Sequence, residues 1–327
     1  MSWKDEFYRL YTSTEENSEC AAFDLKWQNL PEKLFRYRPL GSTERLKRLQ
    51  DEINTGFLFA CPITNQNDPF EGFARLKINT TWRKLLNIET FKSICRDHFK
   101  DYLKSIPSEK IFNSEDWFEK LLQFLAKQEG ESVDELITLF VVSLEKELGI
   151  YFAIEMHTKI RQFINCISFS EKHDNLPMWN HYANEYRGVC LEYSTNKITD
   201  DAIFQRLFPV VYVSEFPAFE YFDFTKWHER CDCICTHKLL DWGYEQEWRF
   251  LTNINYLLNQ KSLMKMDTIP KSNEGCYVEF IKPSKIYLGS NIEEKDEQII
   301  IHLAQVLSIP VSKMNCSSRG LEWVKLL

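Results

Sequence analysis

The spacing of apolar and polar positions divides the chain into three kinds of stretch. Residues 1–32 have a weak helical periodicity and are expected to form a helical lead-in. Residues 33–80 and 164–327 contain short apolar and alternating runs typical of strands, separated by helical segments. In residues 81–163 apolar positions recur at the helical period instead. The pattern predicts an α+β fold: a mixed, twisted sheet flanked by helices, with 81–163 as an inserted helical subdomain.

A strand, a helix and a second strand are predicted at the start of the core. Period two along residues 33–39 puts Arg36 and Arg38 on one face of the first strand, opposite two aromatic side chains. A helix is expected within residues 42–56, because the Ser at its start suits an N-cap and the Gly at its end suits the C′ position. Residues 57–61 are apolar and are expected to form the second strand.

Three helices are predicted within the insertion. The second follows Ser114, and the third opens with Ser132 and Glu135, the two ends of a capping box. The first carries an apolar stripe made of Leu85, Ile88, Phe91, Cys95, Phe99 and Leu103. These apolar stripes either pack within the subdomain or form a surface through which the chain makes a homo-oligomer.

The run from Tyr244 to Phe250 combines acids, an arginine and aromatic residues. As a strand it would place Glu245, Glu247 and Arg249 on one face and the aromatic side chains on the other. Aromatic residues favour a half-buried sheet surface, so the second face is expected to pack. The charged face is then either a salt-bridged edge, in which Arg249 neutralises a neighbouring glutamate, or the floor of an acidic cleft.

Composition and charge narrow the class of protein. The chain has 327 residues, of which 44% are hydrophobic, and this composition is globular rather than disordered. A formal net charge of −8 argues against a surface that simply coats nucleic acid. No apolar run is long enough to span a membrane and the N-terminus lacks the apolar core of a signal peptide, so a soluble cytoplasmic protein is expected. Its ten cysteines are then expected to be free thiols.

Several short strings along the chain are similar to a known family. They are Phe35–Arg38, Asn67–Gly72, Cys166–Glu171, Met178–Ala183 with Gly188, and Tyr244–Arg249. In this order they resemble the bacterial family designated domain of unknown function 2971, over about residues 34–290. The resemblance implies a soluble bacterial protein, and some members lie in defence-type gene neighbourhoods. It implies no activity, and the stretch 82–163 is longer than usual for the family.

The order of three further motifs is similar to that of ADP-ribosyltransferases, which carry an Arg, a Ser-x-Ser and a Glu-x-Glu on three strands of a split sheet. The chain offers Arg36 or Arg38, then Ser168 and Ser170, then Glu245 and Glu247, each on a predicted strand. An Arg fork pairs with pyrophosphate oxygens, serine hydroxyls hold the nicotinamide ribose, and a carboxylate stabilises the cationic sugar as its glycosidic bond breaks. The similarity implies NAD as substrate, with Glu247 as that carboxylate. Glu245 would orient or deprotonate the acceptor, which is a protein or a nucleic acid.

Five further residues are candidates to line a nucleotide site: Tyr37, Asp68, Trp179, His181 and Tyr182. Asp68 precedes a proline in a predicted turn, where it either bonds the turn's own backbone or touches a ribose. Trp179 and Tyr182 lie near one face of a short predicted helix, and they either line a pocket for a nucleobase or nicotinamide or pack in the core. His181 is a candidate acid or base because histidine titrates near neutral pH, with a structural role as the alternative.

The segment from His228 to His237 contains three cysteines and two histidines. A structural zinc site normally needs a second, distant pair of ligands, which here only Cys190 or Cys276 would supply. On a helix, Trp227, Cys231, Ile234, Cys235 and Leu239 would instead form one apolar stripe facing the core. No metal is therefore predicted.

Three functions remain open. The first is an NAD-using ADP-ribosyltransferase-like enzyme, acting as a bacterial defence or toxin effector. The second is a nuclease effector whose acids hold Mg²⁺, namely Asp68, Glu71, Glu192, Glu245 and Glu247. The third is a partner-binding module without catalysis. Phosphate-binding, dinucleotide-binding and serine-hydrolase glycine motifs are absent from the sequence, which argues against those three classes.

Overall fold

The computed structural model describes residues 2–77, 89–98, 108–114, 116–130, 132–139, 142, 158, 164–220, 226–253, 275–318 and 320–327. The chain divides into two compact units. Unit 1 comprises Met1–Gly72, Lys159–Phe216 and His228–Leu327, and unit 2 comprises Phe73–Thr158 and Pro217–Trp227. Helices flank a sheet with both parallel and antiparallel pairs, so the predicted α+β class with a mixed sheet is confirmed.

Unit 1 is built around one large sheet, whose main path runs β11-β2-β4-β1-β5-β12-β13-β14. Strand β10 pairs with β4 and β6 beside this path, and only the β12–β13 pair among the described pairs of this sheet is parallel. The strands are β1 (Lys33–Arg38), β2 (Phe57–Pro62), β4 (Ile164–Ser170), β5 (Val189–Ser194), β6 (Leu207–Pro209), β10 (Glu247–Asn253), β11 (Cys276–Glu279), β12 (Lys285–Leu288), β13 (Val311–Ser317) and β14 (Gly320–Lys325).

The sheet opens between β1 and β4. Strand β1 pairs with β5 along its whole length, whereas its described register with β4 is the one pair Phe35–Ser170. Farther along β4, the partner on the same side is β2, through the pair Cys61–Cys166. Because β1 and β4 part after Phe35, the backbone and side chains between these two contacts face a gap within the sheet.

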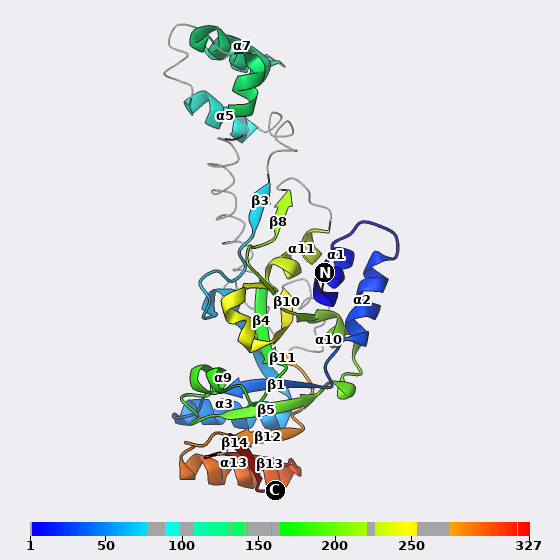
Figure 1. The fold of residues 1–327 in the computed structure, drawn as a ribbon, viewed down its shortest axis with the longest axis vertical. Helices are drawn as coiled ribbons and strands as arrows, with labels where there is room; N and C mark the ends of the chain where they lie inside the picture. The colour runs from blue at the N-terminus through cyan, green and yellow to red at the C-terminus, as the bar shows by residue number, and fades with distance from the viewer. Residues whose placement is uncertain are drawn as a thin grey trace. The chain divides into compact units, whose positions relative to one another are not determined.

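Helices cover both faces of the sheet. Helices α3 (Thr43–Thr55) and α13 (Glu294–Leu307) contribute apolar side chains to the larger core on one face, and α9 (Leu176–Tyr182) contributes to an aromatic cluster on the other. Figure 1 shows α3 and α13 running beside the strands, and α9 near β1. As predicted, Ser42 caps α3 by accepting a hydrogen bond from the Arg45 amide, and Gly56 ends it with a φ of 77°.

Shorter elements complete unit 1, and most of them lie near one end of β10. They are the N-terminal helices α1 (Trp3–Tyr11) and α2 (Ser18–Gln28), then α10 (Asp201–Arg206) and α11 (Trp227–Ile234), the 3₁₀ turns Ile63–Asn65, Thr195–Lys197 and Leu240–Glu245, and a two-stranded parallel sheet of β7 (Val211–Val213) and β9 (His237–Leu239). The predicted helical character of the first thirty residues is confirmed by α1 and α2.

Unit 2 contains the helices α5 (Glu89–His98), α6 (Ser108–Phe112) and α7 (Trp117–Glu129), and a parallel pair of β3 (Arg75–Lys77) and β8 (Ala218–Glu220). The predicted capping box forms: Ser132 Oγ accepts a hydrogen bond from the Glu135 amide at 3.2 Å, and the Glu135 carboxylate accepts one from the Ser132 amide. Of the predicted first stripe, Cys95 is buried, while Leu85, Ile88, Phe99 and Leu103 lie outside the described residues. The exact extent of the insertion stays a prediction.

The predicted strand from Tyr244 to Phe250 is wrong in its first three residues. Residues Leu240–Glu245 form a 3₁₀ turn, and Gln246 has a positive φ of 45° that turns the chain before β10 begins at Glu247. The aromatic side of the strand packs as expected, because Trp248 and Phe250 are fully buried. No helix of the described residues is long and apolar enough to cross a membrane.

Gly188 holds β5 and the end of β1 at close approach. A Cβ on Gly188 would lie 2.2 Å from the carbonyl oxygen of Arg38 and 2.9 Å from that of Ala183. We expect Gly188→Ala to lower the free energy of unfolding by about 2 kcal/mol, because both obstacles are backbone atoms. Urea denaturation would measure this. The control is Gly243→Ala, whose Cβ would meet nothing nearer than 3.9 Å; equal loss of stability in both variants would contradict the prediction.

Candidate functional site

A cavity of about 400 Å³ lies in unit 1 where β1 and β4 part. Eight of the predicted site residues line it: Arg36, Tyr37, Arg38, Ser168, Ser170, Tyr182, Glu245 and Glu247. They come from β1, β4, α9, the 3₁₀ turn Leu240–Glu245 and the start of β10. The cavity also has two further charged lining residues, Glu71 and Lys238.

Three predicted site residues, Asp68, Trp179 and His181, do not line this cavity. The carboxylate of Asp68 is buried and accepts a hydrogen bond from the Phe70 amide at 2.9 Å, so it closes its own turn. Trp179 is fully buried, and its indole N–H donates to the carbonyl oxygen of His173. His181 is exposed on α9, beside Tyr182.

The guanidinium of Arg249 organises the floor of the cavity. It is fully buried and bonds both oxygens of Glu247, at 2.9 Å each, and both oxygens of Glu71, at 2.5 and 2.6 Å. Its Nη1 also donates to the carbonyl oxygen of Cys235 at 2.6 Å. The predicted ion pair between Arg249 and a neighbouring glutamate therefore exists, but it is buried rather than exposed.

Lys238 and Tyr182 hold the second carboxylate. The Lys238 ammonium lies 2.6 Å from Glu245 Oε2, and the Tyr182 hydroxyl donates to Glu245 Oε1 at 2.6 Å. The same ammonium is 3.5 Å from Glu247 Oε2 and from Glu71 Oε1. The floor thus combines three carboxylates with two cations, an excess of one negative charge when all are ionised.

The two glutamates have opposite pKa shifts although they are two residues apart. Burial alone would raise the pKa of Glu247, but the charges of Arg249 and Lys238 outweigh it and lower that pKa to about 2. For Glu245, burial and the neighbouring charge of Glu247 raise the pKa, and the contact with Lys238 only partly opposes them. Glu247 is therefore held as an anion, whereas Glu245 is the group disposed to take up a proton.

The opposite wall of the cavity is cationic. Arg36 Nη1 bonds Glu52 Oε1 at 2.9 Å, and Arg38 Nε lies 3.1 Å from Glu52 Oε2. Tyr193 donates to the same carboxylate at 2.8 Å, and although burial acts the other way, the two arginines lower the pKa of Glu52. Two guanidiniums share this one carboxylate, and the buried Arg38 Nε makes no hydrogen bond within the described residues. An anionic ligand group would balance the excess positive charge on this wall.

The two serines of β4 differ in their availability. Ser170 Oγ donates to the carbonyl oxygen of Glu245 at 2.6 Å and accepts from the Lys172 amide, so it braces the 3₁₀ turn. The hydroxyl of Ser168 is on a half-buried residue and lies 3.5 Å from Cys166 Sγ. Ser168 is therefore the serine better disposed to contact a ligand.

Several acids and thiols of the chain lie elsewhere. Of the five acids proposed for a Mg²⁺ nuclease site, Glu71, Glu245 and Glu247 line the cavity, while Asp68 and Glu192 do not. Helix α11 ends at Ile234, earlier than the predicted stripe, and Cys231, Cys233 and Cys235 are buried with burial raising the pKa of each thiol. In the part of the chain that the structure describes, no group of three or more His, Cys, Asp or Glu side chains is arranged to hold a metal ion.

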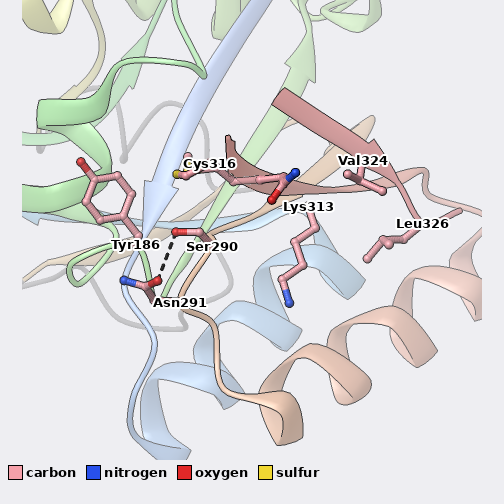
Figure 2. Close-up of a pocket in the computed structure, with 9 residues that line it drawn as sticks. Tyr186, Ser290, Asn291, Lys313, Cys316, Val324 and Leu326 are labelled. Atoms are coloured by element: carbon pink, nitrogen blue, oxygen red, sulfur yellow. Dashed lines mark hydrogen bonds between the residues drawn. The ribbon is translucent and has the colours of Figure 1, made fainter. Parts of the chain in front are cut away.

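A second cavity, of about 620 Å³, lies beside β13 and β14 (Figure 2). Its lining residues are Tyr186, Ser290, Asn291, Lys313, Met314, Asn315, Cys316, Val324 and Leu326. Lys313 extends away toward α13, where its ammonium lies 2.6 Å from Glu297, and Ser290 bonds Asn291. No carboxylate or imidazole is part of this described lining, so the first cavity is the candidate site.

Comparison with known proteins agrees with the resemblance found in the sequence. Residues 178–250 match a family model described as Protein of unknown function (DUF2971). The chain resembles DUF2971 proteins. The DUF2971 match runs from α9 into β10, and it contains Tyr182, Lys238, Glu245 and Glu247 of the cavity. No curated protein and no solved structure matches the chain.

Within the DUF2971 match, Lys238 is the site residue that the sequence analysis missed. The predicted helix extended to Leu239 and so passed through Lys238 without giving it a role, whereas α11 ends at Ile234 and Lys238 lies in β9. A signal was present, because Lys238 is a charged residue followed by two leucines in a stretch expected to be buried. A buried lysine needs carboxylate partners, and the two glutamates that follow a few residues later provide them.

The low pKa of Glu247 gives a pH dependence of stability. Its folded pKa of about 2 lies below the ordinary 4.5, so its ionisation stabilises the fold above pH 4.5, and this contribution is lost as the pH falls toward 2. We expect wild type to exceed Glu247→Gln in free energy of unfolding by about 3 kcal/mol near pH 7. The gap should narrow below about pH 4.5 in urea denaturation series. A gap that is constant with pH would contradict this origin.

Proposed function

We propose that the protein is an NAD-using enzyme of the ADP-ribosyltransferase type, which breaks the bond between nicotinamide and ribose. The observation that carries the proposal is the meeting of three motifs in one cavity. Arg36 and Arg38 come from β1, the two serines from β4, and Glu245 and Glu247 from the segment that leads into β10. Their order along the chain was the sequence argument, and their convergence where the sheet opens supports it.

The charges of the cavity match those of NAD. The wall formed by β1 has two guanidiniums for one carboxylate, and the floor near Glu247 has three carboxylates for two cations. The pyrophosphate of NAD is anionic, and its nicotinamide ring carries a positive charge. A bound NAD would therefore place its phosphates toward Arg36 and Arg38 and its nicotinamide ribose toward Glu247. The cavity volume of about 400 Å³ is in the range of small-molecule sites.

The proposed reaction begins with cleavage of the glycosidic bond. The electron pair of that bond moves to the ring nitrogen and neutralises the nicotinamide, which leaves a cationic sugar carbon. The Glu247 carboxylate, kept ionised by Arg249 and Lys238, would stabilise this positive charge. Water or another acceptor then bonds to the sugar carbon, and its proton passes to Glu245 and on to solvent. Two carboxylates whose pKa values are pushed apart are suited to these separate roles.

The metal-dependent nuclease is less well supported by the arrangement of acids. Each of the three carboxylates on the floor already lies within 3.5 Å of Lys238 or Arg249. A Mg²⁺ ion would have to displace these cations or be repelled by them. Loss of nucleic acid that depends on Mg²⁺ would favour the nuclease. If the protein neither cleaves NAD nor degrades nucleic acid but forms a tight complex with a partner, a binding module would be favoured.

Glu247→Gln tests the catalytic role directly. The amide keeps the shape of the side chain but removes the negative charge, so we expect nicotinamide release from NAD to fall by about 10²–10³-fold in kcat. The control is Glu192→Gln, because Glu192 is a buried carboxylate outside the cavity, bonded by Tyr287 and Lys33. Turnover that is unchanged in folded Glu247→Gln would remove this residue from catalysis, and wild type without NAD cleavage would refute the proposed function.

Arg38→Lys tests the anion-binding wall. Lysine keeps a positive charge but not the planar fork that bonds two phosphate oxygens at once. We expect KM for NAD to rise about tenfold with kcat nearly unchanged, since this contact acts on binding rather than on the reacting bond. Steady-state nicotinamide release measures both constants. A fall in kcat at constant KM would place Arg38 in a different role.

A further inference from the structure

The small sheet of β7 and β9 delivers two side chains to the same glutamate. Tyr212 and Lys238 are register partners in this parallel pair, so their side chains project from neighbouring strands on the same side. The Tyr212 hydroxyl accepts a hydrogen bond from the Glu247 amide at 2.8 Å, and the Lys238 ammonium lies 3.5 Å from the Glu247 carboxylate. The pair is therefore built against the start of β10, although it belongs to a separate sheet.

Lys238 is more buried and has more contacts than a lysine in an exposed ion pair. Its side chain is almost fully buried, and the ring centre of Trp242 lies 4.5 Å from its ammonium. Its shortest contact, 2.6 Å, is with Glu245 and not with Glu247. Since Glu247 already has Arg249 as a bidentate partner, Lys238 is the cation that neutralises Glu245.

We propose that Lys238 is a positioning residue, whose ammonium holds and orients the Glu245 carboxylate so that it can accept a proton. This inference rests on the proposed function for its catalytic meaning. It adds a residue that takes no part in the bond-making steps and whose shortest contact is with Glu245. Arg249 has the corresponding role for Glu247, to which it makes a bidentate contact.

The groups around Glu245 determine the direction in which its pKa changes when Lys238 is replaced. They are Tyr182 from α9, Glu71 from the turn after β2, Tyr212 from β7, Lys238 from β9, Tyr244 from the 3₁₀ turn, and Glu247 with Arg249 from β10. Burial and Glu247 raise the pKa of Glu245, whereas Lys238 is the first of the groups that lower it. Removing the ammonium leaves the raising influences unopposed, so Glu245 should then hold its proton to higher pH.

The test is a titration of Glu245 in Lys238→Met and Lys238→Arg, read by ¹³C NMR of glutamate-labelled full-length protein and assigned with Glu245→Gln. We expect the midpoint for Glu245 to rise by about one pH unit or more in Lys238→Met, and to return most of the way in Lys238→Arg. The control is Lys313→Met, which removes an ion pair of the same 2.6 Å length outside the cavity and should leave Glu245 unchanged. Lys238→Gln, which also removes the charge, replaces Lys238→Met if that variant does not fold.

An unchanged midpoint in a folded, charge-free variant would overturn the inference. So would an equal shift in Lys313→Met, because it would indicate a general loss of structure. The pH profile of nicotinamide release supplies the second measurement: its acidic limb should move to higher pH in Lys238→Met by the same amount as the midpoint. Wild type without NAD cleavage refutes the proposed function alone, because the titration still decides whether Lys238 controls Glu245.

Discussion

Much of unit 1 depends on one buried cation, Arg249. Its guanidinium joins three segments that are remote in sequence: Glu71 in the turn after β2, Glu247 at the start of β10, and the carbonyl of Cys235 between α11 and β9. A charge buried this deeply is tolerated only when its donors are satisfied, and here two carboxylates and a carbonyl satisfy them. Losing the guanidinium would leave the buried carboxylates of Glu71 and Glu247 with Lys238 as their remaining cation, so we expect it to destabilise the fold.

The candidate site follows from this cluster and from the parting of β1 and β4. Because β4 changes its partner from β1 to β2 along one edge, side chains of both strands line a space within the sheet rather than a surface beside it. Arg249 and Lys238 hold the acids on one side of that space, and Glu52 holds Arg36 and Arg38 on the other. The charged groups are thus oriented before any ligand arrives.

Local sequence patterns were sufficient to predict β1, α3 and β2. The strand alternation, the N-cap at Ser42 and the glycine at position 56 each depend only on residues close by in the sequence. The motif order also identified six of the residues that line the cavity, and Tyr37 and Tyr182 were named beside them. Three features needed tertiary information. Gln246 has a left-handed backbone that no local pattern required, so the strand was begun too early. The role of Lys238 was missed because its carboxylate partners are set by the position of β9. The burial of Trp179 by α9 likewise depends on how that helix packs.

The unequal charge of the two walls has a thermodynamic consequence. A folded chain without ligand retains an uncompensated carboxylate on one side of the cavity and a spare guanidinium on the other, and each repels its like-charged neighbours. A ligand with charges of both signs would relieve both at once, and it would bind only to the folded form. Occupancy and folding are then linked, so that part of the stability of this domain would reside in the molecule it binds.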